Sequence, residues 1–124
     1  MSTTVQSPVS ALPSPSDALS VTTHRAGSVV VVSAHGDVDA ATALPLRDHL
    51  RELVRSHGPD LVLDLTAVTF FGGAGLTVLT DVRAAANRAG IGFRVLASTR
   101  AVLVPLRVTG MDTVLDVLPI PPRR

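Results

Sequence analysis

Residues 70–76 combine two aromatic side chains with a run of glycines. They follow an apolar strand pattern at 60–65 and lead into a helical pattern that begins near Ala74. The start of a helix presents free backbone N–H groups and the positive end of the helix dipole. These groups suit a phosphate, either bound or covalently attached. The segment contains no hydroxyl group, however, and the nearest acceptor is Thr77, one turn further along.

A phosphate-binding loop is one interpretation of Gly72, Gly73, Ala74 and Gly75, but the segment lacks the Lys-Ser/Thr pair of a P-loop and the spacing G-x-G-x-x-G. The other interpretation is structural, because glycine permits a tight turn and a close approach of helix to strand. The local pattern favours the structural interpretation.

Aspartates near the first helix and late in a strand are the other candidates for chemistry. His35, Asp37 and Asp39 alternate, so an extended chain presents them on one side, where they suit a divalent metal. Turn and capping chemistry accounts for the aspartates without a metal, and no further His or Glu cluster completes a shell. Asp64 lies where open α/β sheets place ligands, or it bonds the backbone that follows. We therefore predict no metal and no cofactor.

No side chains are arranged by spacing as a nucleophile–base pair, so we expect no enzymatic activity. Arg47, Arg51 and Arg55 recur at intervals of four with Asp48 and Glu52 beside them, which is typical of a solvated helix face.

Composition narrows the class of protein further. The 124 residues are 46% hydrophobic with net charge +1, and they include no Cys, Trp, Tyr or Lys. The absence of Cys excludes disulfides and thiolate sites. Nucleic-acid binding is not expected, because the chain has neither clustered basic charge nor aromatic side chains for stacking on bases. No apolar run reaches the roughly 18 residues of a membrane span, and no basic-then-apolar leader is seen. We expect a cytoplasmic protein that binds neither nucleic acid nor membrane.

The chain divides into a Ser/Pro/Thr-rich tail at 1–17 that is predicted to be disordered, one domain at 18–118, and an unstructured end at 119–124. Strands are predicted at 19–23, 28–34, 60–65 and 93–97. Helices are predicted at 41–56, 74–89 and from 98 or 99 to about 109, and a short edge strand or helical turn at 113–117. Loops are expected at 36–39 and 66–73. Pro45 is expected in a first turn, and Pro105 predicts a kink or a late start.

This order predicts an α/β domain with a mixed, mostly parallel sheet of four to five strands. An antiparallel hairpin turning at Gly27 forms its N-terminal edge, and about three to four helices pack against it. One core of aliphatic side chains suits this length.

Three segments resemble the STAS domain family, and specifically the bacterial anti-sigma factor antagonists. Residues 36–42 are similar to its G-E/D-L/V-D helix opening, residues 61–70 to its apolar-D-L-S strand and loop, and residues 103–111 to its closing helix end. The resemblance covers residues 19–118 and implies a STAS-type single domain.

The resemblance also implies a function. Members of this family bind an anti-sigma factor that is itself a GHKL-type serine kinase, and so free a sigma factor. Phosphorylation in a D-S-S/T-G motif adds roughly −1.5 to −2 charges and weakens the complex. That motif aligns with residues 72–75, which places Ala74 at the acceptor position, where no phosphorylation is possible.

We therefore expect a partner-binding surface that is insensitive to phosphorylation, with Phe71 as an exposed apolar anchor. Its expected residues are Asp37, Asp39, Phe71, Gly72, Gly73, Ala74, Thr77, Thr80 and Asp81. Two alternatives stay open: a STAS adaptor that binds other STAS proteins or itself, and a domain that binds a small ligand or nucleotide at the glycine turn.

Overall fold

The computed structural model describes residues 19–55 and 58–118, so the predicted tails at 1–17 and 119–124 lie outside the described residues. The elements follow one another as β1 (Leu19–Ala26), β2 (Val29–Val38), α1 (Ala40–Arg55), β3 (Asp60–Phe71), α2 (Gly73–Ala89), β4 (Phe93–Leu96), α3 (Arg100–Thr109), the 3-10 turn η3 (Met111–Thr113) and β5 (Asp116–Leu118). No helix of this described part combines the length and the apolarity needed to cross a membrane.

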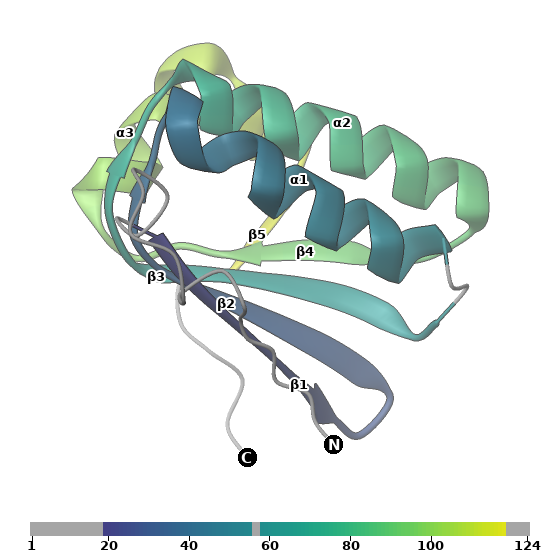
Figure 1. Ribbon diagram of the computed structural model, residues 1–124. Coiled ribbons are helices and arrows are strands. Elements are labelled where there is room, and N and C mark those ends of the chain that lie inside the picture. The colour runs from purple at the N-terminus through teal and green to yellow at the C-terminus, as the bar shows by residue number, and fades with distance from the viewer. Residues whose placement is uncertain (1–18, 56–57, 119–124) are drawn as a thin grey trace.

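The five strands form one sheet in the order β1-β2-β3-β4-β5. β1 and β2 form an antiparallel hairpin, and the remaining neighbours are parallel. α1 and α2 lie side by side over one face of this sheet (Figure 1). The predicted α/β architecture with a mixed sheet and an N-terminal edge hairpin is confirmed.

The core is aliphatic and lies between the sheet and the helices. Alternate residues of β3, Leu61, Leu63 and Leu65, are at most 2% exposed, as the period-two pleat requires. Leu50 of α1 and Val82 of α2 meet them from apolar helix stripes and are fully buried. Truncating any such leucine to alanine costs about 2–5 kcal/mol.

Two predicted loops are in fact strand. β2 continues through residues 36–38, and β3 continues through residues 66–71. The two extensions pair with each other, Asp37 with Phe70 and Val38 with Phe71, after a register shift between Gly36 and Asp37. Gly36 and Asp37 have weak strand propensity, so the tertiary pairing decides their conformation, whereas residues 66–71 include Thr, Val and Phe, which favour a strand.

The starts of two helices differ from what their prolines predicted, and the alternative of a kink at Pro105 stays a prediction. α1 begins at Ala40, which puts Pro45 in its second turn rather than its first. α3 begins at Arg100, directly after Thr99, and contains Pro105, so the late start is wrong. Gly110 ends α3 in the left-handed conformation at φ 78°, as predicted. The segment predicted at 113–117 overlaps the edge strand β5, which runs from Asp116 to Leu118.

Candidate functional site

The candidate site is the start of α2. β3 leads into Gly72, whose N–H donates to the carbonyl oxygen of Val38 at 3.1 Å, so β2 and β3 stay joined up to the helix. Gly72 is the N-cap residue of α2 and is extended, with φ −97° and ψ −169°. This conformation suits any residue, so the predicted need for glycine in a tight turn is wrong at position 72. Because glycine has no side chain, the first turn of α2 also lacks a side-chain cap.

Close packing of helix against strand, the other expected role of glycine, is found at Gly75. A Cβ built there would lie 2.7 Å from Cε1 of the Phe71 ring. At Gly73 the same Cβ would meet nothing within 4 Å. Packing therefore requires glycine at position 75, whereas position 73 has room for a side chain.

Phe71 is not exposed as expected, and its neighbour Phe70 is the exposed ring. Phe71 is 4% exposed and belongs to the core, whereas Phe70 is 52% exposed. The expectation of Phe71 as an exposed anchor is therefore wrong. Its physical reason is the extension of β3, because Phe71 pairs with buried Val38 and turns toward the helices. Phe70 packs against Gly72, where a Cβ would lie 3.1 Å from ring atom Cε2.

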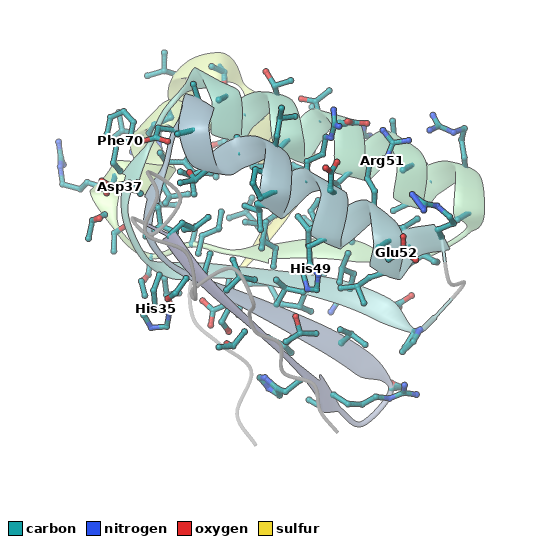
Figure 2. The ribbon with its side chains drawn as sticks, viewed as in Figure 1. His35, Asp37, His49, Arg51, Glu52 and Phe70 are labelled. Atoms are coloured by element: carbon teal, nitrogen blue, oxygen red, sulfur yellow. The ribbon has the colours of Figure 1, made fainter. Side chains whose placement is uncertain are left out.

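The aspartates before α1 border the same end of the sheet. Asp37 is the register partner of Phe70, and both side chains lie at this end in Figure 2. One carboxylate oxygen of Asp37 accepts a hydrogen bond of 2.7 Å from the Thr69 hydroxyl. Asp37 therefore borders the exposed ring with its charge held in place by a neighbouring strand.

Asp39 caps α1. Its Oδ1 accepts from the backbone N–H of Ala41 at 2.9 Å and of Thr42 at 3.1 Å, while the N–H of Asp39 donates to the Thr42 hydroxyl at 3.0 Å. This reciprocal pair is a form of the capping box. The capping role expected for Asp39 is confirmed, and its carboxylate is largely committed to the helix.

The two threonines predicted on the outer face of α2 are exposed. Thr77 and Thr80 donate their hydroxyls back to the helix, to the carbonyl oxygens of Gly73 at 3.2 Å and Leu76 at 3.1 Å. They extend the surface from the start of α2 along its second turn.

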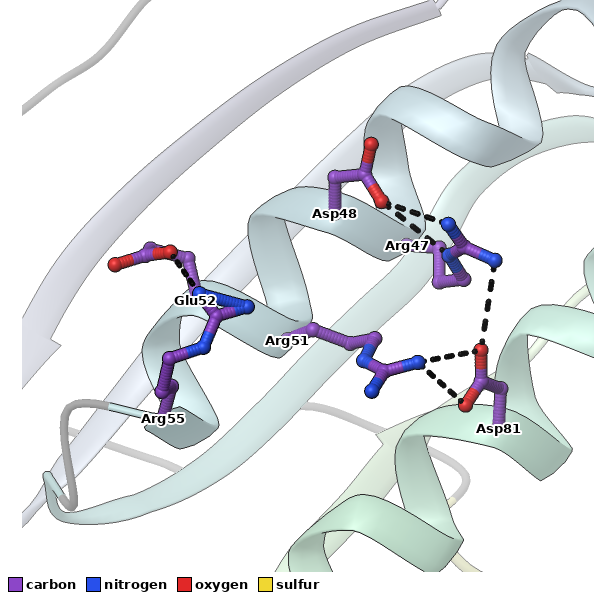
Figure 3. Close-up of polar contacts among 6 residues, drawn as sticks. All are labelled: Arg47, Asp48, Arg51, Glu52, Arg55 and Asp81. Atoms are coloured by element: carbon purple, nitrogen blue, oxygen red, sulfur yellow. Dashed lines mark hydrogen bonds and ion pairs between the residues drawn. The ribbon is translucent and has the colours of Figure 1, made fainter.

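Asp81 is partly buried in an interhelical ion pair. Its carboxylate lies 3.1 Å from Nη1 of Arg51 and 3.8 Å from Nη1 of Arg47, both on α1 (Figure 3). The arginine row predicted to be a solvated face thus joins α1 to α2. Sequence spacing did not reveal this contact, because it depends on which faces of two helices meet. Arg55 keeps the local pair with Glu52 at 2.8 Å.

Asp64 bonds its own strand. Its Oδ1 accepts from the N–H of Thr66 at 2.9 Å and from the hydroxyl of Thr66 at 2.6 Å. Of the two interpretations of Asp64, the structure supports the local backbone bond.

An apolar pocket of about 30 Å³ lies at the C-terminal end of α1, away from the start of α2. Its lining includes Val30, Leu53, Val54, Leu61 and Ile91. That volume suits about one water molecule, whereas ligand pockets are typically about 300–1,000 Å³. In the described residues, no group of three or more His, Asp or Glu side chains is arranged to hold a metal ion.

Comparison with known proteins gives consistent matches. Residues 21–119 match the family model described as "Mlab, STAS domain". The anti-sigma-F factor antagonist RsfB of Mycobacterium tuberculosis is 33% identical over 96 residues, which are 77% of this chain and 78% of that protein. RsfA of the same organism, also an anti-sigma-F factor antagonist, is 29% identical over 109 residues, which are 86% of this chain and 83% of that protein.

Solved structures agree in fold. An anti-sigma factor antagonist from Mycobacterium paratuberculosis superposes with a TM-score of 0.79 and 31% identity, covering 88% of this chain and 92% of that one. The antagonist SpoIIAA in its unphosphorylated form has a TM-score of 0.67 at 11% identity, covering 78% and 86% of the two chains, and supports the fold alone. The chain is a member of the STAS domain family.

Proposed function

We propose that this chain is a regulatory binding protein of the anti-sigma factor antagonist type. It binds an anti-sigma factor of the GHKL kinase type and thereby controls the availability of a sigma factor. The relatives named above support this proposal, since both are anti-sigma-F factor antagonists and match most of the chain. The role is one of binding in the cytoplasm, without catalysis.

The binding surface we propose lies around the start of α2. Phe70 replaces Phe71 as its apolar anchor, because its ring is 52% exposed beside the charge of Asp37. Exposed aromatic side chains at the centre of an interface typically contribute much of the binding energy. Gly72, Gly73, Ala74, Thr77 and Thr80 complete the surface, with Asp39 and Asp81 at its margins in their structural bonds.

We further propose that the complex is not released by phosphorylation at the usual position. The observation that carries this proposal is the lack of any hydroxyl in residues 72–74 at the start of an otherwise complete α2. A serine at position 73 has open space, so steric exclusion does not explain the missing hydroxyl. Complex formation is then set by the amounts of the two proteins and not by a phosphate on this segment.

The test compares the wild-type chain with the triple variant Gly72→Asp, Gly73→Ser, Ala74→Ser. Each is incubated with ATP and with each purified GHKL-type anti-sigma factor of the source organism, and binding is measured by calorimetry and phosphate by intact mass. We expect the wild type to bind one such kinase without gaining a phosphate, and the triple variant to gain one. If the wild-type chain gains one phosphate stoichiometrically, the proposal that phosphorylation does not release the complex is wrong. If the wild-type chain binds none of these kinases, the antagonist function is wrong.

A matched control distinguishes the effect of the added acid and side-chain volume from the effect of the added hydroxyl groups. The variant Gly72→Asp, Gly73→Ala, Ala74→Ala carries the same acid with no acceptor, and we expect it to stay unphosphorylated. Recovery of other STAS proteins in place of a kinase in a pull-down would support the adaptor alternative.

A further inference from the structure

α3 carries apolar side chains on two opposite faces. Val102 and Leu106 are fully buried and belong to the core. Val104 and Val108 each come two residues later in the chain, about 200° around the helix, and face outward. They are 37% and 80% exposed. Packing within the domain therefore explains the first pair of apolar residues and leaves the second pair unexplained.

The other helices leave this outer face of α3 uncovered. α1 and α2 pack against each other, whereas α3 packs against β3 and η3. In Figure 1 α3 lies at the end of the molecule where β3 leads into α2. Val108 is the most exposed large hydrophobic residue in the described part of the chain, and Val104 lies one turn before it. The two valines form an apolar stripe that is accessible to another molecule.

Two arginines border this stripe. Arg100 and Arg107 lie two turns apart along one side of the helix, and both are exposed. Neither guanidinium forms an ion pair within residues 19–55 and 58–118, whereas Arg51 and Arg94 each pair with an aspartate. The outer face of α3 thus combines apolar contact area with two positive charges that no described carboxylate neutralises.

We propose that the outer face of α3, formed by Arg100, Val104, Arg107 and Val108, is a second docking surface that binds an acidic amphipathic helix of a partner protein. The apolar side of such a helix covers the two valines, and carboxylates beside it pair with the two guanidinium groups. None of these four residues belongs to the surface around the start of α2, so binding at α3 does not require the function proposed above.

Charge and side-chain size favour this partner over two others. A second copy of the chain that docks α3 against α3 supplies no carboxylate, because α3 contains no Asp or Glu. An anionic membrane attracts arginine, but helices that lie in the membrane interface insert large side chains such as Trp, Phe and Leu. The apolar residues exposed on α3 are valines. An acidic amphipathic helix supplies both the carboxylates and a matching apolar side.

Designed peptides of known charge test this surface. The acidic probe is a helical peptide with Leu at positions i, i+3, i+4 and i+7 and Glu beside that stripe. The basic probe has Lys in place of every Glu, and the polar probe has Ser in place of every Leu. Each peptide carries one terminal Trp, whose fluorescence reports binding because the chain contains no Trp. Each probe is titrated with the full chain up to about 1 mM in low salt.

We expect the acidic probe to bind about tenfold more tightly than the basic probe or the polar probe, and its affinity to fall as salt is added. The double variant Arg100→Glu, Arg107→Glu is expected to reverse the preference and bind the basic probe, because the charges on the two sides are then exchanged. Val108→Ser is expected to weaken binding of the acidic probe about threefold, because it removes apolar contact area.

The double variant Arg25→Glu, Arg88→Glu is the matched control. It changes the net charge by the same amount at two exposed arginines outside α3, and we expect it to change the affinity for the acidic probe less than about threefold. Phe70→Ala alters the surface around the start of α2 and is expected to bind the acidic probe like the wild type. Circular dichroism establishes that each variant is folded before it is titrated.

Several results overturn the proposal. Equal binding of the acidic and basic probes, or binding of neither, means that α3 does not select an acidic helix. An equal loss in the two arginine double variants assigns the effect to overall charge, and a loss in Phe70→Ala places the probe at the start of α2. A dimer in size-exclusion chromatography that Val108→Ser abolishes assigns the face to a second copy. Tighter binding to phosphatidylglycerol vesicles than to the acidic probe assigns it to a membrane.

Discussion

The Phe71 ring occupies the space beside Gly75, so that a Cβ at position 75 would lie 2.7 Å from ring atom Cε1. This contact sets how closely α2 approaches the end of β3. It also fixes Phe71 as a core residue and leaves Phe70 outside.

Substituting Gly75 by alanine is therefore expected to destabilise the domain. An extra methyl group against a packed ring forces side-chain or backbone shifts that cost about 1–3 kcal/mol. Urea unfolding followed by circular dichroism measures the loss. Gly73→Ala is the matched control, because its Cβ meets nothing within 4 Å, and an equal loss in both variants would contradict the packing explanation.

The adjacent phenylalanines should separate binding from stability. Phe71→Ala removes a buried ring and is expected to lower the free energy of unfolding by about 3–5 kcal/mol. Phe70→Ala removes a half-exposed ring, so we expect a loss of stability below about 1 kcal/mol. Its affinity for the anti-sigma factor should fall at least tenfold, as measured by calorimetry, and unchanged affinity would exclude Phe70 as the anchor.

The ion pair between Arg51 and Asp81 should contribute modestly and depend on salt. Its side chains are 38% and 27% exposed, so solvent screens much of the attraction, and we expect Asp81→Asn to cost less than about 1 kcal/mol. Thermal unfolding at low and high ionic strength measures the effect, which should shrink at high salt. Glu52→Gln, in the more exposed pair with Arg55, is the control with the smaller expected effect.

Stability should fall in mild acid because of His49. Its Nε2 lies 2.7 Å from the Thr23 hydroxyl, joining α1 to β1, and burial lowers the pKa of His49 below the ordinary 6.5. The unfolded chain therefore takes up the proton first, so this contribution is complete above pH 6.5 and declines as the pH falls toward the folded-state pKa. Urea midpoints from about pH 7.5 to 5.5 should fall less steeply for His49→Gln than for the wild type. An identical slope for both proteins would contradict this role.

The sequence predicted the types and order of the elements because hydrophobic periodicity reports which face of each is buried. It did not predict that residues 66–71 are strand, although their Thr, Val and Phe side chains favour one, because the partner segment, residues 35–38 of β2, is distant in the sequence. The placement of Phe70 and Phe71 depended on that pairing, because a shift by one residue reverses which side chain is buried.

The candidate site was predictable only in part. Asp39 carries a local capping signal, so its role followed from the chain alone. The contact of Asp81 with Arg51 joins residues 30 positions apart and follows from the packing of α1 against α2. Contacts of this kind can be predicted only once the packing of the helices is known.

The ion pair of Asp81 with α1 also shows how differently the two ends of α2 are held. It joins the third turn of α2 to Arg51 of α1, while the first turn of α2, at Gly73 and Ala74, carries no side-chain cap. A partner that binds the first turn therefore contacts an end of α2 without a side-chain cap, whereas the following turns are held by the buried residues Val78, Leu79 and Val82. We therefore expect changes at the start of α2 to act on a partner through this surface directly and not through a shift of the whole helix.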